Sequence, residues 1–225
     1  MPIPFALDCA SMRKLIHLTL SPASRLARLL VGEKRLTCDP VLSEDSQLHL
    51  PVFVDLDGTS VTGLWAIVDH LEGTYQDHPL MPEDPLARGL TLRWLDWAFG
   101  PFHDQVTRRI VFEKGAQRFT GAPQRSAPDM NVIRAGREAL RASLKQIGTA
   151  ADTTGNLAAR ECTIADLAVA AHLSALDYLG EVPWSEFQQA AEWYVRIKSR
   201  PAFRTLLGDR VPGQPPTASY AELDF

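Results

Sequence analysis

The stretch at residues 50–71 reads LPVFVDLDGTSVTGLWAIVDHL and contains a short apolar strand, a tight turn and a helix. Pro51 opens the strand, where a residue without a backbone N–H is tolerated. Asp57-Gly58 is typical of a two-residue hairpin turn, because both central residues of that turn need positive φ. Val61 then ends the partner strand, and residues 64–71 have the apolar spacing of a helix. The segment predicts a ββα unit.

Upstream of this unit the sequence predicts a strand, a helix and a second strand, at residues 14–19, 21–32 and 37–42. The helix begins at Ser21-Pro22, because proline suits the first helical turn and a serine oxygen can accept a backbone N–H there. Its leucines share one face, so we expect Arg25 and Arg28 to point outward to solvent. The first half of the chain is therefore βαβ followed by ββα.

A proline-rich linker at residues 75–85 precedes a half that reads as entirely helical. Asp84-Pro85 predicts the first helix start, and a stripe of apolar side chains follows at helical spacing: Leu86, Leu90, Trp94 and Trp97. Asp129 predicts a second start, with Ile133, Leu140, Leu144 and Ile147 on one stripe. Thr163 and Asp166 resemble a capping box that opens a helix apolar on all sides, which predicts burial. Further helices are expected at residues 184–199 and from Pro201.

The composition excludes several classes of protein. The chain has 225 residues, of which 45% are hydrophobic and 22% charged, as in ordinary globular proteins. The formal net charge of −4 does not favour nucleic acid. No apolar run approaches the roughly 20 residues of a membrane span, so we expect no membrane insertion. Three widely spaced cysteines indicate a reducing compartment and give no metal-ligand pattern, so no metal site is expected.

Both ends of the chain differ in composition from its body. Residues 1–11 make a poor signal peptide, and we expect the folded part to begin at Met12. Residues 208–225 are rich in proline and glycine and end in YAELDF. Such a tail cannot form a core of its own. It either lies along the body of the protein or presents a short peptide to a partner.

Residues 101–125 carry five cations and two anions, a local charge of +3: Arg108, Arg109, Lys114, Arg118 and Arg125 against Asp104 and Glu113. This segment is either a solvated helix face or a docking face for an acidic partner. Arg109 and Glu113 are spaced i,i+4, so they also fit a simple surface pair.

Other conspicuous residues favour structural roles. The six histidines show no ligand spacing, and His172 lies in an apolar helix, so we interpret it as a hydrogen-bonded core residue. Cys38 and Cys162 are expected to be inert small hydrophobes. Trp94, Trp97, Trp184 and Trp193 are expected in the core or at a dimer interface.

The order of elements, together with six segments in sequence, resembles the glutathione S-transferase (GST) superfamily. The segments lie at residues 21–34, around Pro51, and at 64–72, 80–89, 163–173 and 193–203. The resemblance implies an α/β thioredoxin-like N-terminal domain and an all-helical C-terminal domain. It gives these expected boundaries: an extension at 1–11, the N-terminal domain at 12–74, the linker at 75–85, the helical domain at 86–207 and the tail at 208–225.

In this family a hydroxyl or thiol at the first helix stabilises the glutathione thiolate, which Ser21 matches, with Ser24 nearby; Ser21 also fits a plain helix cap. Pro51 would be the family's cis-proline. After the fourth strand the family uses a Glu/Asp-Ser pair to hold the γ-glutamyl group, whereas this chain has Thr62-Gly63. Losing one charge-assisted contact costs roughly 1.5–3 kcal/mol. Only residues 43–50 separate the second strand from Pro51, so the helix that binds the glycine end is expected to be lost or reduced to a turn.

Segments at 127–136, 171–184, 193–213 and the terminal YAELDF are similar to a family of GST-like division proteins from alphaproteobacteria that bind the tubulin homologue FtsZ. That resemblance implies a cytoplasmic homodimer at the division site that binds FtsZ filaments and promotes constriction, with no required cofactor. It makes Arg109 and Glu113 candidate filament contacts and Asp224 a candidate for signalling to the division machinery. The alternative is a divergent glutathione transferase that uses Ser21, with glutathione weakly bound.

Overall fold

A four-stranded sheet forms the first half of the protein. The computed structural model describes residues 12–43, 49–123 and 127–222. Strand β1 (Arg13–His17) pairs in parallel with β2 (Cys38–Leu42) and antiparallel with β3 (Val52–Val54). Strand β3 pairs antiparallel with β4 (Ser60–Thr62), so the strand order is β2-β1-β3-β4. Gly58 has φ +85° in the β3–β4 hairpin, which confirms the predicted turn, but Asp57 does not have positive φ, so this is not the two-residue turn type in which both central residues need it.

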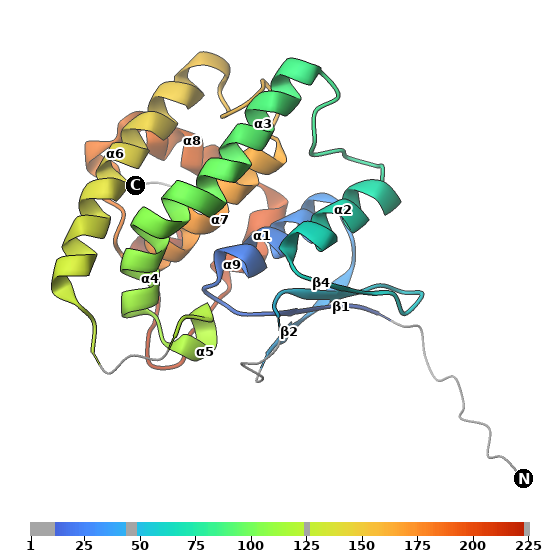
Figure 1. Ribbon diagram of the computed structural model, residues 1–225, viewed down its shortest axis with the longest axis horizontal. Helices are drawn as coiled ribbons and strands as arrows, with labels where there is room; N and C mark the ends of the chain where they lie inside the picture. Colours follow the sequence, from blue (N-terminus) through green and yellow to red (C-terminus); the bar gives the residue numbers. More distant parts are fainter. Residues whose placement is uncertain (1–11, 44–48, 124–126, 223–225) are drawn as a thin grey trace, which may run out of the picture.

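Helices α1 (Pro22–Glu33) and α2 (Leu64–Thr74) complete this half and confirm the predicted βαβ–ββα order. Figure 1 shows both helices on the side of the sheet that faces the helical half. Helix α1 also packs against α7 and against the short segment that follows α8. It is therefore enclosed between the sheet and the second half of the chain.

The second half is helical, as predicted. It contains α3 (Pro85–Trp97), a π-helical segment η1 (Ala98–Thr107), α4 (Arg108–Lys114), α5 (Gln117–Thr120), α6 (Met130–Thr154) and α7 (Ile164–Tyr178). It continues through η2 (Trp184–Glu186), α8 (Gln188–Lys198), η3 (Pro201–Phe203), α9 (Arg204–Leu207) and η4 (Ala218–Ala221). Every residue of α7 is buried, which makes this helix the centre of the half.

Three predicted helix starts are confirmed by their caps. The carboxylates of Asp84 and Asp129 accept backbone N–H groups at the first turns of α3 and α6. Thr163 and Asp166 form the capping box of α7, in which each side chain accepts the other residue's backbone N–H. Asp166 is fully buried and accepts two further N–H groups, from the Leu157 backbone and the Trp193 indole. This box therefore also holds the connection between α6 and α7.

One helix prediction was wrong in detail. The helix expected at 184–199 is two segments, because Phe187 has φ −135° and interrupts the helical backbone between η2 and α8. The apolar spacing on α3 predicted the helix correctly, and its side chains differ in burial: Leu86 is 74% exposed, and the other three are half-buried. Trp94 and Trp97 pack against the core, where the Trp97 ring lies 4.9 Å from that of Phe102.

Arg25 is the largest departure from the sequence-based expectation, because its side chain is 0% exposed. Its guanidinium donates to the Thr19 carbonyl at 2.8 Å, to Ser174 Oγ at 2.8 Å, to the Tyr220 hydroxyl at 2.9 Å and to Asp209 Oδ2 at 3.0 Å. Arg28 is also buried and pairs with Asp209. The outward placement of both arginines was wrong, because the tail covers the one face of α1 that the sheet and α7 leave open.

The tail lies along the body over the residues that the structure describes, which confirms the first of the two alternatives. Tyr220 is 0% exposed, and its hydroxyl donates to the Leu206 carbonyl. The Tyr178 hydroxyl accepts from the Val211 N–H and donates to the Gln214 carbonyl. Three of the four partners of Arg25, namely Ser174, Asp209 and Tyr220, therefore lie more than 140 positions away in the chain.

We expect Arg25→Met to lower the free energy of unfolding by about 3 kcal/mol, because the change leaves two buried hydroxyls without their donor and removes one of the two cations paired with Asp209. Urea denaturation measures this directly. Arg134→Met, which removes an exposed arginine from α6, is the control and should stay within about 0.5 kcal/mol of the wild type. A loss below about 1 kcal/mol for Arg25→Met would show that the buried guanidinium does not hold the two halves together.

Candidate functional site

Strand register brings three of the predicted site positions to one edge of the sheet. Ile16 on β1, Val52 on β3 and Thr62 on β4 are paired across one row. The loop after β1, the residue before β3 and the residue after β4 therefore meet at the same edge. This edge holds Ser21, Pro51 and Gly63.

Pro51 follows a cis peptide bond from Leu50, as the resemblance to the GST superfamily implied. The Gly63 N–H donates to the Pro51 carbonyl at 2.8 Å. This bond ties the turn before α2 to the start of β3, so the backbone of the site is fixed by the sheet.

The two serines at α1 have different roles. Ser24 is buried, and its Oγ accepts the Leu18 N–H at 3.1 Å, so it holds the β1–α1 loop. Ser21 is the N-cap residue of α1, but its side chain accepts no capping hydrogen bond, so its role as a side-chain cap was wrong. Its half-buried hydroxyl lies at a helix N-terminus, a position that favours a bound anion.

The turn before α2 offers backbone groups but no acid. Gly63 is the N-cap residue, has φ +89° and provides no side-chain cap, and the first turn of α2 contains no acidic residue. Thr62 is exposed and uncharged. A Cβ on Gly63 would lie 3.3 Å from the ring of His49, so the imidazole packs directly beside this turn. The site can present N–H groups to a carboxylate, but Thr62 and Gly63 cannot neutralise an ammonium group.

The predicted loss of a helix between β2 and Pro51 concerns residues 43–50, of which 44–48 lie outside the described residues. Ser43 directly follows β2, and its N–H donates to the His17 carbonyl. His49 and Leu50 lead into β3 without helical structure. Over the described part of this connection, the chain stays close to the sheet edge.

Helix α4 places Arg109 and Glu113 at a common recess. The recess has a volume of about 350 Å³ and is lined by both residues, with Asp104, Phe112 and Val132 among the others. Arg109 is half-buried, and a Cβ on Gly136 would lie 2.8 Å from its Cβ, so α4 contacts the backbone of α6 here. Glu113 is only 6% exposed and accepts the Asp129 N–H at 3.0 Å. Both side chains line the recess, but that of Glu113 is mostly buried beneath the surface, where it contacts the backbone before α6.

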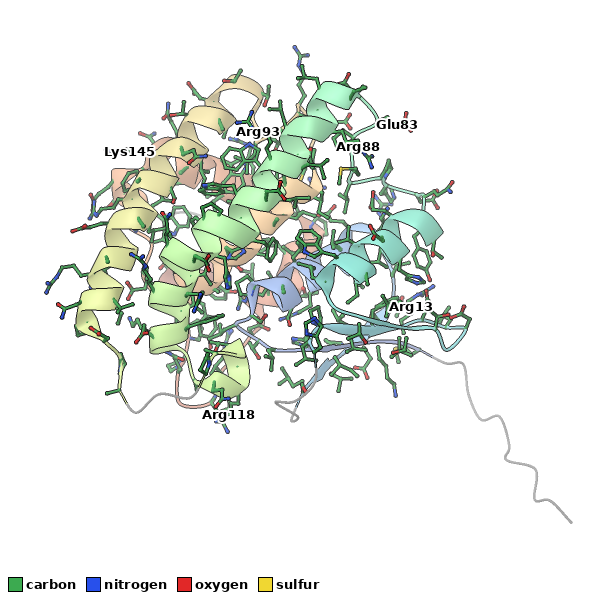
Figure 2. All side chains as sticks on the ribbon, viewed as in Figure 1. Arg13, Glu83, Arg88, Arg93, Arg118 and Lys145 are labelled. Carbon is green, nitrogen blue, oxygen red and sulfur yellow. The ribbon has the colours of Figure 1, made fainter. Side chains whose placement is uncertain are left out.

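Pairing reduces the positive charge counted over residues 101–125. Lys114 pairs with Glu181, which also accepts two hydrogen bonds from Arg137. Burial alone would raise the pKa of Glu181, but hydrogen bonds from Arg137 and Lys114 lower it overall. Arg108 is within 3.4 Å of Asp104, with both side chains exposed. Arg118 is exposed at the outer surface (Figure 2), where its guanidinium lies 4.6 Å from the centre of the Phe119 ring.

The tail is joined to this region through Gln214, whose side-chain amide donates to the Lys114 carbonyl at the end of α4. Asp224, the predicted signalling residue, lies outside the described residues. Sequence reasoning missed Asp209 and Tyr220 as partners of α1, because nothing in a proline-rich segment identifies the distant cation that it covers.

The remaining candidates behave as core residues. His172 is buried, and its Nδ1 lies 2.7 Å from Thr107 Oγ1, which confirms the core interpretation. Burial raises the pKa of Cys38 to about 11 and also raises that of Cys162, which disfavours the reactive thiolate form at both positions. Among the described residues there is no cluster of potential metal ligands and no helix long and apolar enough to cross a membrane.

Comparison with known proteins gives strong matches over nearly the whole chain. FtsZ-localized protein A of Caulobacter vibrioides (strain NA1000 / CB15N) is 39% identical over 228 residues, covering 95% of this chain and 98% of that protein. The structure of FzlA from C. crescentus matches with a TM-score of 0.88 and 39% identity, covering 96% of this chain and 100% of that one. A glutathione S-transferase from Rhodospirillum rubrum F11 matches with a TM-score of 0.89 and 37% identity, covering 95% of this chain and 100% of that one. No family model matches the chain.

We expect Gly63→Ala to lower the free energy of unfolding by about 1–2 kcal/mol, because an L-residue is strained at φ +89° and its Cβ would press on His49. Gly89→Ala is the matched control, since Gly89 lies inside α3 with open space around it and should gain roughly 0.5–1 kcal/mol. Thermal denaturation of both variants measures the difference. Equal effects in the two variants would contradict the assigned strain.

Proposed function

This chain belongs to the family of FtsZ-localized protein A, which has the glutathione S-transferase fold, and we propose that it binds FtsZ filaments at the division site and promotes constriction. The relationship at 39% identity over 95% of the chain carries the proposal. We place the protein in the cytoplasm, where its filament partner assembles. Within it we assign a thioredoxin-like domain to residues 12–74 and a helical domain to 86–207, joined by the linker 75–85.

The sheet edge supports a function without efficient glutathione chemistry. The cis-proline and the backbone bond to Gly63 are retained, so the fold at this edge is intact. The turn nevertheless lacks the acid that would hold an ammonium group, and Gly63 lacks a hydroxyl. A lost contact of this kind lowers affinity by about one to two decades. This combination fits an enzyme scaffold that serves as a binding protein.

We assign the filament contact to the recess on α4. Two cations line this recess, Arg108 and Arg109. Arg108 lies 3.4 Å from Asp104, whereas Arg109 has no ion pair among the described residues. FtsZ filaments are the acidic partner in this assignment, so a cation within a shallow recess suits the contact. Glu113 positions the segment before α6 through its bond to the Asp129 N–H. Asp224 at the end of the tail then acts on the rest of the division machinery, separately from filament contact.

We expect Arg109→Glu to weaken co-sedimentation with polymerised FtsZ by about tenfold or more, because it replaces an attractive charge by a repulsive one. The melting temperature should change by less than about 2 °C, because Arg109 has no ion pair among the described residues. Lys145→Glu, an equal charge reversal on the exposed face of α6, is the control and should pellet like the wild type (Figure 2).

The assignment fails if the two variants pellet equally well. If the wild type itself does not pellet with the filaments, the proposed function is wrong. Glutathione-independent pelleting is part of the expected result.

We also propose that the protein is a homodimer that uses the apolar face of α3. Leu86 is 74% exposed, and Trp65 on α2 is 47% exposed. Large exposed apolar side chains of this kind cost free energy in contact with water. A second copy of the chain covers such a face without any further partner.

We expect Leu86→Glu to shift the molar mass measured by light scattering from that of two chains to that of one, because it places a charge in the proposed interface. Met130→Glu is the control, since Met130 is an exposed apolar residue on α6, outside this face. A wild-type protein of one chain's mass would contradict the dimer.

The second candidate function is a divergent glutathione transferase. One observation favours it: the Ser21 hydroxyl makes no capping bond at the N-terminus of α1, at the same sheet edge as the cis-proline. Calorimetry with glutathione decides between the two functions. Micromolar affinity would favour the enzyme, and we expect no binding in that range.

A further inference from the structure

A second, larger recess lies away from the sheet edge and from α4. Its volume is about 720 Å³, within the usual range for small-molecule sites. Four segments meet there: the end of α1, the linker before α3, the α6–α7 connection and the end of α8. The proposed filament contact uses none of these residues.

The recess is basic although the protein is acidic overall. Four arginines line it, at positions 35, 160, 196 and 200, together with two glutamates, Glu33 and Glu161. Arg200 forms a bidentate pair with Glu33, with distances of 2.6 and 2.7 Å. Over the described residues, no carboxylate lies within ion-pair distance of the other three arginines. An excess of two positive charges in a concave site attracts a dianion.

Two non-glycine residues with positive φ lie on the same recess. Arg35 has φ +54° and His78 has φ +57°, and these are the two in the described part of the chain. Arg35 ends helix α1, because its N–H and that of the next residue donate to carbonyls of the last helical turn, and a positive φ is usual at this position. Both side chains are exposed and come from different segments. They add a cation and an imidazole to the lining of the recess.

The floor of the recess is apolar and uncharged. Leu80 and Ile197 are 5% and 2% exposed, and both line it. Cys162 also lines it, and burial raises the pKa of its thiol, which stays neutral. Arg196 donates to the Gly155 carbonyl at 2.6 Å, which fixes one wall against the end of α6. A ligand here would place an apolar or aromatic body on the floor and its charges at the rim.

We propose that this recess binds a soluble phosphorylated small molecule with an aromatic body, such as a nucleotide. Arg35 and Arg160 contact the phosphate groups, since their guanidinium groups can bind phosphate oxygens in bidentate fashion. Leu80 and Ile197 contact the aromatic body. Since the ligand touches the turn after α1 and helix α8 at once, its binding stabilises the contact between the two halves of the protein.

The test is calorimetry of the full chain with ADP, with inorganic pyrophosphate and with adenosine, at low salt. We expect one ADP per chain with a Kd below about 1 mM, pyrophosphate at least tenfold weaker, and no detectable adenosine binding. ADP should raise the melting temperature by several degrees at a concentration of 100 times Kd. Added salt should weaken ADP binding, because the contact is electrostatic.

The double variant Arg35→Asn and Arg160→Gln should lose at least tenfold in ADP affinity and keep its fold by circular dichroism. Asparagine tolerates the positive φ at position 35. The control is the double variant Arg134→Gln and Lys145→Gln, which removes the same charge from the exposed face of α6.

Equal losses in both double variants would attribute binding to overall charge and overturn the proposal. No ADP binding at several millimolar, or equal binding of adenosine, would also overturn it. Binding to phosphatidylglycerol vesicles without ADP binding would assign these arginines to a membrane surface instead, and would exclude the proposed ligand.

Discussion

The buried guanidinium of Arg25 connects parts of the chain that no local interaction brings together. It contacts the loop after β1, the central helix α7 and two points of the tail. Burial of an unpaired charge is very costly, so each of these partners must be in place for α1 to occupy its position. The position of α1, whose N-terminus lies at the sheet-edge site, therefore depends on Asp209 and Tyr220 in the tail.

This dependence extends to both candidate sites. Asp209 serves Arg25 and Arg28 together, and the segment that follows it passes Tyr178 and reaches the end of α4 through Gln214. The tail thus links the buried arginines to the helix that carries Arg109. The proposed phosphate site lies at the opposite end of α1, where Arg200 pairs with Glu33. A displacement of α1 would therefore change the geometry of each of these surfaces.

The sheet edge shows how a fold can persist while a side-chain contact is absent. The cis peptide bond and the Gly63 N–H to Pro51 carbonyl bond are backbone features, and the sheet register maintains them. Binding of a ligand's charged groups depends instead on the side chains at the same positions. Because these two requirements are separate, Thr62-Gly63 can retain the first without the second.

The sequence by itself determined the features that depend on neighbouring residues: the hairpin at Gly58, the caps at Asp84, Asp129 and Thr163, and the order of strands and helices. These follow from backbone conformation and short-range hydrogen bonds, which a few adjacent residues specify. Only the tertiary structure decided that Arg25 and Glu113 are buried, that Leu86 on α3 is exposed, and that four arginines from three distant segments share one recess. Their environments are set by residues far away in the chain, and periodicity along one helix cannot report what packs against it.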